Sequence, residues 1–307
     1  MKKNKILHRS LYLLLIAAIQ YVVRFFVIKP YYNLIGVSLQ MPEWLFALLV
    51  LSTLCIAIGG FFIADYYNKR QLSPVPRNSM EKADSRYTAF MVFSFIGCGL
   101  GLFIGWKIQF FNLGILFIIY ATVLYFYALR YRLLAFWGNF VIALMVVVLI
   151  LNVWLFEFFA TRNNLEALNI LASQRQILSA INTAIFSYSI FYFVLIFAQQ
   201  IVKDIVISPR AASGSRIFPI RYGLKTTKVI LLVTLILLLI PSVLFFIAPF
   251  VLSKDYSYSF IAGIFVIICE FILIFKVLRS SIVDDFKSSE YLFDILIILG
   301  IVALLFQ

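Results

Sequence analysis

Two acidic residues, Asp65 and Asp204, stand at the ends of apolar stretches, and each is followed by a basic segment that contains proline. The basic side chains in these two places are Lys69, Arg70, Arg77, Lys203, Arg210 and Arg216. Lysine and arginine bind phosphate oxygens through charge-assisted hydrogen bonds. We therefore expect the two acid-bearing ends to be two walls of one site, which binds a phosphate or diphosphate group.

An acid at the C-terminal end of a helix lies against the helix dipole and needs a nearby cation. The sequence offers Lys69 and Arg70 for Asp65, and Lys203 for Asp204. A local ion pair at each helix end is the alternative to a shared site, and both interpretations stay open at this point.

The composition predicts that these residues are positioned by membrane helices. Of the 307 residues, 64% are hydrophobic and 13% are charged. A soluble domain cannot bury this much apolar surface, so we expect the bilayer to be the solvent of an all-α integral membrane protein. About nine spans of bilayer length form a single domain over residues 1–307. The predicted spans are 11–28, 44–64, 87–106, 110–129, 133–156, 177–201, 229–252, 258–277 and 291–306.

The distribution of Lys and Arg predicts the orientation. The net charge is +13, and the N-terminus with the even-numbered loops carries about four times as many Lys and Arg as the odd-numbered loops. This bias predicts a multi-pass protein of the cell membrane, with the N-terminus in the cytoplasm and, if there are nine spans, the C-terminus outside. The loops 65–86 and 202–228 would then be cytoplasmic. Because membrane topology explains the positive charge, we do not expect nucleic acid as a partner.

The chain offers little for metal or relay chemistry based on histidine or cysteine. His8 is the only histidine and stands between basic residues at the membrane edge, so we do not expect a His-based metal site or a Ser–His relay. The three cysteines lie in apolar runs without metal-ligand spacing.

Three local patterns predict features of the bundle. Gly97, Gly101 and Gly105 recur at every fourth residue and favour close approach of a neighbouring helix. Pro241 falls in the seventh span and is expected to kink it. The connection 157–176 is expected to hold a short helix at the membrane interface.

Polar residues within the spans are unfavourable in free energy, because they lie in an apolar medium, and they are therefore candidates for function. Gln20 and Arg24 share a helix face, Glu270 lies in the eighth span and Asp294 near the start of the ninth. One interpretation is structural, with Arg24 paired to Glu270 or to a lipid head group. The other is that these residues line a substrate cavity.

Two segments resemble the aspartate-rich motifs of the UbiA superfamily of intramembrane prenyltransferases. Ala64-Asp65-Tyr66-Tyr67-Asn68 resembles the start of the first motif, approximately N-D-x-x-D-x-x-x-D, which ends the second helix. Lys203-Asp204, with Arg216 before Ile217-Phe218-Pro219, resembles the second motif, approximately K-D-x-x-D-x-x-x-D followed by G-x-x-T-L-P, at the end of the sixth helix. We interpret the chain as a divergent, bacterial-type member with degenerate motifs.

The resemblance implies a UbiA-like bundle around a central cavity. It implies transfer of a polyprenyl group from a prenyl diphosphate to an aromatic or lipid-type acceptor. Asp65 and Asp204 would be the catalytic acids and, in an active enzyme, would hold Mg²⁺. The six basic residues would bind the diphosphate. The candidates to line the cavity are Tyr12, Gln20, Arg24, Asn68, Tyr127, Arg130 and Asn139.

The sequence also departs from the family pattern. Asn68 and Leu72 stand where the first motif has its second and third aspartates, and no acid follows Asp204 as far as Arg210. A net basic site needs Mg²⁺ less, so a site without metal is also expected. Three hypotheses follow: an active prenyltransferase of reduced activity, an inactive relative that binds prenyl diphosphate or another anionic lipid or scaffolds a partner, and a small transporter.

Overall fold

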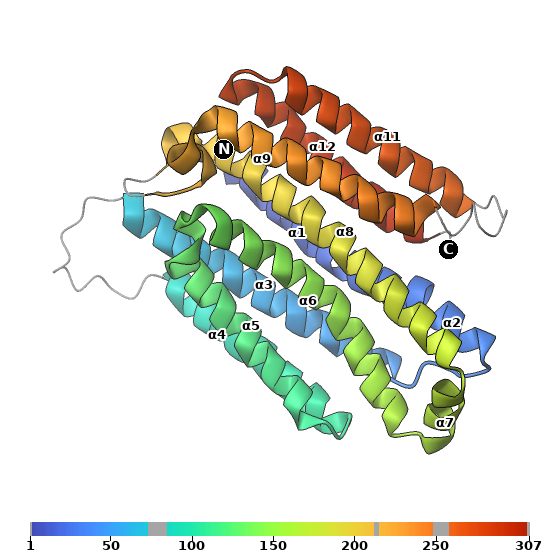
Figure 1. Ribbon diagram of the computed structural model, residues 1–307. Coiled ribbons are helices and arrows are strands. Elements are labelled where there is room, and N and C mark those ends of the chain that lie inside the picture. Colours follow the sequence, from blue (N-terminus) through green and yellow to red (C-terminus); the bar gives the residue numbers. More distant parts are fainter. Residues whose placement is uncertain (1, 73–84, 212–214, 248–257, 306–307) are drawn as a thin grey trace. The chain divides into compact units, whose positions relative to one another are not determined.

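The computed structural model describes residues 2–72, 85–211, 215–247 and 258–305, and the regular elements in these ranges are helices (Figure 1). The long helices are α1 (Lys2–Val22), α3 (Glu43–Leu72), α4 (Ser85–Lys107), α5 (Phe111–Leu129), α6 (Ala135–Arg162), α8 (Arg175–Ile207), α9 (Phe218–Ser242), α11 (Tyr258–Arg279) and α12 (Val283–Leu304). Short helical elements connect them: η1 (Val23–Ile28), α2 (Lys29–Leu34), η2 (Tyr131–Leu133), α7 (Leu165–Ser173), η3 (Ser208–Arg210) and η4 (Val243–Ile247).

Within these ranges, eight helical segments are long and apolar enough to cross a membrane, which confirms the all-α membrane fold. They correspond to the first eight predicted spans. The ninth, 291–306, falls on α12, where Glu290 and Asp294 add charge to the helix. The predicted ends of the seventh span at 252 and of the ninth at 306 lie outside the described residues.

The predicted connection 157–176 is partly wrong. The short helix exists as α7, but α6 continues through 157–162 and ends only at Arg162. Buried Glu157 lies in this part of α6, and its Oε1 accepts hydrogen bonds from the backbone N–H groups of Gln40 (2.6 Å) and Met41 (3.1 Å). This carboxylate thus belongs to the helix and fixes the chain that leads into α3.

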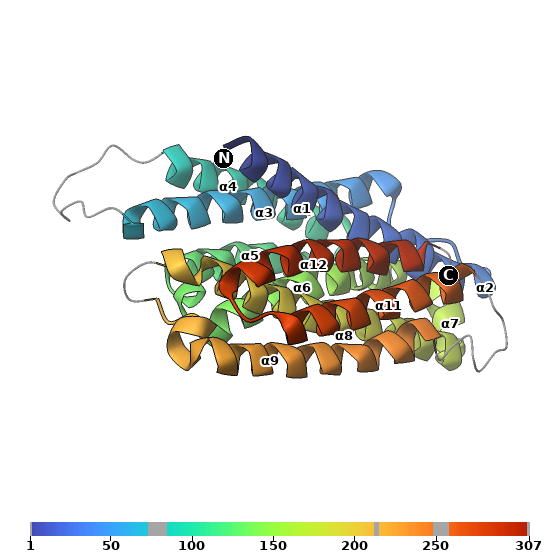
Figure 2. The ribbon, with the colours of Figure 1, turned by 90° about the horizontal axis from the view of Figure 1, so that it is seen from above.

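The chain divides into two compact units, each described here by itself. Unit 1 comprises residues 1–20, 39–132 and 155–169, and unit 2 comprises 21–38, 133–154 and 170–307. In unit 1, α3, α4 and α5 pack against one another (Figures 1 and 2). In unit 2, α8 packs against α9 and α12, and α11 packs against α9 and α12.

The glycine stripe of α4 has the predicted role in unit 1. A Cβ at Gly97 would lie 2.7 Å from Ile56 on α3, and a Cβ at Gly101 would lie 2.4 Å from the Phe117 ring on α5. At Gly105 it would meet the backbone nitrogen of Gly114 at 2.9 Å. Small residues therefore let α4 approach both neighbours closely, as membrane helices commonly do.

Helix α9 departs from regular geometry at two places in unit 2. Gly223 has φ 78° and ψ 160°, so a short helical turn from Phe218 precedes the apolar part. Pro241 lies near the end of α9, and the π-helix η4 follows directly after Ser242. A proline cannot donate its backbone hydrogen bond, and a π-helix is a common way to accommodate such a break. The sequence predicts a kink at Pro241, and the structure shows a change in helix type two residues later; the kink itself stays a prediction.

Candidate functional site

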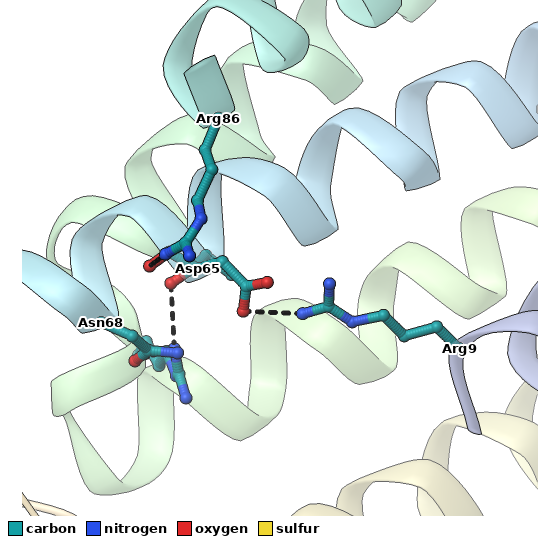
Figure 3. A network of polar contacts seen from close by, with 6 residues as sticks. Arg9, Asp65, Asn68 and Arg86 are labelled. Atoms are coloured by element: carbon teal, nitrogen blue, oxygen red, sulfur yellow. Dashed lines mark hydrogen bonds and ion pairs between the residues drawn. The ribbon is translucent and has the colours of Figure 1, made fainter. Parts of the chain in front are cut away.

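Asp65 lies near the end of α3 and forms an ion pair with Arg9 of α1 (Figure 3). Arg9 Nη2 donates to Asp65 Oδ1 over 2.7 Å, and the two side chains are 27% and 16% exposed. Both groups are thus partly withdrawn from water. A charge-assisted hydrogen bond in such a place is stronger than one at an open surface. Arg9 supplies the cation that an acid against the helix dipole requires.

Two further arginines reach the same turn of α3. Arg86, at the start of α4, donates to the backbone oxygen of Asp65 over 3.5 Å, and Figure 3 shows its side chain directed at this turn. Arg132, in η2, donates to the side-chain oxygen of Asn68 and, over 3.5 Å, to the backbone oxygen of Ala64. We call Arg9, Arg86 and Arg132 the arginine cluster. Three elements thereby bring three permanent positive charges to one turn of α3, and Arg9 is the one that binds the Asp65 carboxylate.

A group of four tyrosine side chains lies beside this turn. On α3, the rings of Tyr66 and Tyr67 lie 5.1 Å apart; Tyr66 contacts Tyr87 of α4 at 5.5 Å, and Tyr67 contacts Tyr125 of α5 at 6.2 Å between ring centroids. The Tyr67 hydroxyl donates to the Tyr125 hydroxyl over 3.2 Å. Aromatic side chains give an apolar body with a polar tip. The arginine cluster therefore borders a group of tyrosines that packs on the buried residues Ile63, Phe90 and Ala128.

Asp204 lies near the end of α8 in unit 2, and its carboxylate is bound by an amide. Asn139, buried near the start of α6, donates from Nδ2 to Asp204 Oδ2 over 3.0 Å. The cavity-lining candidate and the predicted catalytic acid of this unit are thus direct partners. That Asp204 shares a cavity with Asp65 stays a prediction.

Lys203 belongs to a chain of polar groups that leads to α12. Its Nζ donates to Gln199 Oε1 over 3.3 Å, and Gln199 Nε2 donates to Asp294 Oδ1 over 2.8 Å. The carboxylates of Glu290 and Asp294 also attract the Lys203 charge. Asp294 therefore has a local role, because it binds the glutamine that holds Lys203.

Arg216 is exposed and joins its segment to the start of α6. Its backbone nitrogen donates to the Leu133 oxygen over 2.8 Å, and its backbone oxygen accepts from Ala135 over 2.9 Å. This bridge fixes the segment that follows the second motif, while the guanidinium stays accessible.

The other predicted residues have varied environments. Gln20 is buried and bonds Thr53 of α3 over 3.0 Å. Arg24 is buried within the π-helix η1. Tyr12 and Tyr127 are half-buried, and Arg130 is exposed after α5. The side chains of Lys69, Arg70 and Arg210, and all of Arg77, lie outside the described part of the structure.

The pairing of Arg24 with Glu270 is wrong for the described residues, because the hydrogen-bond partner of Glu270 is Ser242. The members of the arginine cluster were not chosen as site residues from the sequence. A signal was present, because Arg9, Arg86 and Arg132 lie in the N-terminus and the even-numbered loops, on the side of the membrane where Asp65 is predicted.

Each unit by itself offers one motif aspartate as a ligand for Mg²⁺. This ion prefers several oxygen ligands and is usually held by one or two carboxylates with phosphate and water. Asp65 is already bound by Arg9 and Asp204 by Asn139. Among the described residues, no group of three or more acids, cysteines or histidines is placed to hold a metal. Mg²⁺ shared by the two aspartates stays a prediction.

Two cavities in the described parts of the chain lie away from these groups. One of about 470 Å³ follows the first half of α8 between Arg175 and Ile190. The other, of about 250 Å³, lies at the start of α3 beside Trp44, whereas Asp65 stands near the end of that helix. Neither contains an acid or a member of the arginine cluster.

No protein-family model matches the sequence, and no curated protein matches it. Solved structures share the fold. A structure reported in work on digeranylgeranylglyceryl phosphate synthase in membranes superposes with a TM-score of 0.61 at 18% identity, over 99% of this chain and 98% of that one. The apo structure of a UbiA homolog from Aeropyrum pernix K1 gives a TM-score of 0.60 at 12% identity, over 95% and 97% of the two chains. The expected UbiA-like fold is therefore confirmed over nearly the whole chain.

Proposed function

We propose that this protein is a divergent, bacterial-type UbiA-like membrane prenyltransferase. It would transfer a polyprenyl group from a prenyl diphosphate to an aromatic or lipid-type acceptor. The observation that carries the proposal is the convergence of Arg9, Arg86 and Arg132 on the turn of α3 that bears Asp65. The UbiA-like fold and the adjoining tyrosines support it.

The arginines would bind the diphosphate oxygens directly. A guanidinium presents several N–H donors in a plane and keeps its charge at any physiological pH. When the bond between the allylic carbon and the diphosphate oxygen breaks, the electron pair stays on the leaving diphosphate. The arginine cluster would stabilise that charge as it develops. The acceptor then forms the new bond to the allylic carbon and releases a proton.

Asp65 would hold Arg9 in position while no substrate is bound. Its carboxylate holds the guanidinium at 2.7 Å, so Arg9 is ordered before an anion arrives. In unit 2, Lys203 and Arg216 would also bind diphosphate oxygens, and Asp204 would be the second catalytic acid. Asn139 binds the Asp204 carboxylate, and Gln199 accepts a hydrogen bond from Lys203. We propose that both motif segments lie on the cytoplasmic side, as the distribution of Lys and Arg predicts.

A specific observation favours a second function, that of a non-catalytic protein binding a prenyl diphosphate. The carboxylate of Asp65 is neutralised by Arg9, and the family's remaining first-motif acids are replaced by Asn68 and Leu72. Loss of metal-based stabilisation of a leaving group raises the barrier by several kcal/mol, so turnover would slow by orders of magnitude. Binding would remain.

One titration separates the two functions. The purified protein in lipid is titrated with geranylgeranyl diphosphate, with Mg²⁺ or with a chelator, while pyrophosphate release is followed in the presence of candidate acceptors. Release that Arg9→Gln abolishes supports the enzyme. Tight binding without release supports the non-catalytic protein. Absence of binding under both conditions contradicts both proposals, and flux into sealed vesicles would then favour a transporter.

A further inference from the structure

Unit 2 holds a buried acid that the proposed function does not use. Glu270, in the middle of α11, is 1% exposed, and Ser242, the last residue of α9, is fully buried. Ser242 Oγ is in hydrogen-bond contact with Glu270 Oε1. The other carboxyl oxygen, Oε2, is buried and has no hydrogen-bond partner among the described residues.

The serine has too few protons for both of its contacts. Ser242 Oγ also lies 2.9 Å from the backbone oxygen of Leu238, one helical turn earlier. A serine hydroxyl has one donor proton and two acceptor lone pairs. The carbonyl can only accept, and a hydroxyl within a helix commonly donates to that carbonyl, as Thr234 does to Ile230 over 2.8 Å. The proton between Ser242 and Glu270 must then come from the carboxyl group.

The surroundings favour the same assignment. An ionised carboxylate in an apolar interior needs a cation or several donors, and otherwise takes up a proton. The elements packed against α11 are α9, η4 and α12. Among their described residues none presents a cation to Glu270, and Cys269, its neighbour in the chain, is the titratable group that interacts with it.

We propose that Glu270 is a proton-binding site within the membrane, in which a neutral carboxyl group donates a hydrogen bond to Ser242 Oγ. The contact lies where the α-helix α9 changes into the π-helix η4. Nearby, a Cβ at Gly263 would lie 2.8 Å from the Phe246 backbone oxygen, so α11 also approaches η4 closely. The proton of Glu270 thus forms the hydrogen bond that joins α11 to the end of α9, and loss of that proton would break this hydrogen bond.

Infrared difference spectroscopy on the full chain in lipid tests the assignment. The difference between the wild type and Glu270→Gln, near neutral pH, should contain the carbonyl band of a protonated carboxyl group, and that band should shift in D₂O. A difference containing only carboxylate bands would overturn the proposal. Asp294 and Glu157 are present in both proteins, so their bands cancel.

A second variant covers the case in which Glu270→Gln does not fold. Ser242→Ala removes the acceptor, so the carboxylic-acid band should move to higher frequency, as expected for an acid without its hydrogen bond. If no carboxylic-acid band moves, the serine is the donor and the proposal fails. Diphosphate binding by the arginine cluster should be unchanged in both variants, so this test is independent of the proposed function.

Discussion

Arg9 and Asp65 are 56 residues apart in the sequence and join α1 to α3 through a 2.7 Å ion pair. The same guanidinium lies 5.2 Å from the ring centroid of Phe61, one turn before Asp65. Arg9 is therefore held both by the acid and by an aromatic face, an arrangement that suits arginine better than lysine. An anion entering this place would meet a guanidinium that is already oriented.

Replacing Arg9 should weaken anion binding. A hydrogen bond to a charged group contributes about 1.5–3 kcal/mol, so Arg9→Gln should weaken binding of geranylgeranyl diphosphate by about tenfold or more. Calorimetric titration in lipid nanodiscs measures the effect. Arg175→Gln is the matched control. Arg175 is exposed and begins α8, whereas Asp204 lies near the end of the same helix. Equal affinity of wild type and Arg9→Gln would remove Arg9 from the site.

The pair of Asn139 and Asp204 should be coupled energetically. Removing one partner of a buried hydrogen bond costs about 1–3 kcal/mol, so Asn139→Ala should destabilise the protein measurably. Asn33→Ala, at an exposed position of α2, serves as the control. In a double-mutant cycle with Asp204→Ala, the two effects should be non-additive by about 0.5–3 kcal/mol. If the losses in the free energy of unfolding of the two single variants, measured with denaturant, add up in the double variant, the 3.0 Å contact does not stabilise the fold.

The sequence allows the membrane fold to be predicted because hydropathy and helix length are local properties. The close approach at Gly97, Gly101 and Gly105 was predictable for the same reason, since the stripe is readable from spacing alone. The π-helices η1 and η4 were not predicted, because a change in helix type depends on which backbone groups neighbouring helices can satisfy.

The positions of the two acids were predictable, but their partners were not. The nearest basic residues in the sequence, Lys69 and Arg70, were expected to compensate Asp65, and their side chains lie outside the described part of the structure; among the described side chains Arg9 forms the ion pair with Asp65. Asn139 stands 65 residues before Asp204. Contacts at such separations depend on helix packing, and the positive-inside pattern gives only the side of the membrane on which each group lies.

Asp285 should make the stability of α12 depend on acid pH. Its carboxylate accepts hydrogen bonds from the backbone N–H groups of Ser281 (2.8 Å) and Ile282 (3.1 Å), and these lower its pKa below the ordinary value of 3.8. A lowered pKa in the folded state stabilises the protein above the ordinary pKa, and this stabilisation disappears as the pH falls through the folded pKa. Wild type should therefore melt at a higher temperature than Asp285→Asn near neutral pH, and the difference should close in acid.

The neighbouring Asp284 provides the control for this pH dependence. It pairs with Lys287 three residues later, and both side chains are largely exposed. Exposed pairs of this kind contribute little, so Asp284→Asn should leave the melting temperature nearly unchanged. Melting curves recorded over a pH series compare the three proteins. A difference between wild type and Asp285→Asn that persists after the pH has fallen below the folded-state pKa of Asp285 would contradict the capping role of its carboxylate.

Helix α4 carries two glycines for which the same substitution should have opposite effects. A Cβ at Gly101 would lie 2.4 Å from the ring of Phe117, which is fully buried and cannot move aside. Gly101→Ala should therefore destabilise the packing of α4 on α5 by about 1–3 kcal/mol, as overpacking does. A Cβ at Gly99 meets nothing within 4 Å, and Gly99→Ala should keep or raise stability by up to about 1 kcal/mol, since alanine favours the helix. Thermal unfolding in one detergent measures both variants, and equal melting temperatures would show that Gly101 does not set the distance between the two helices.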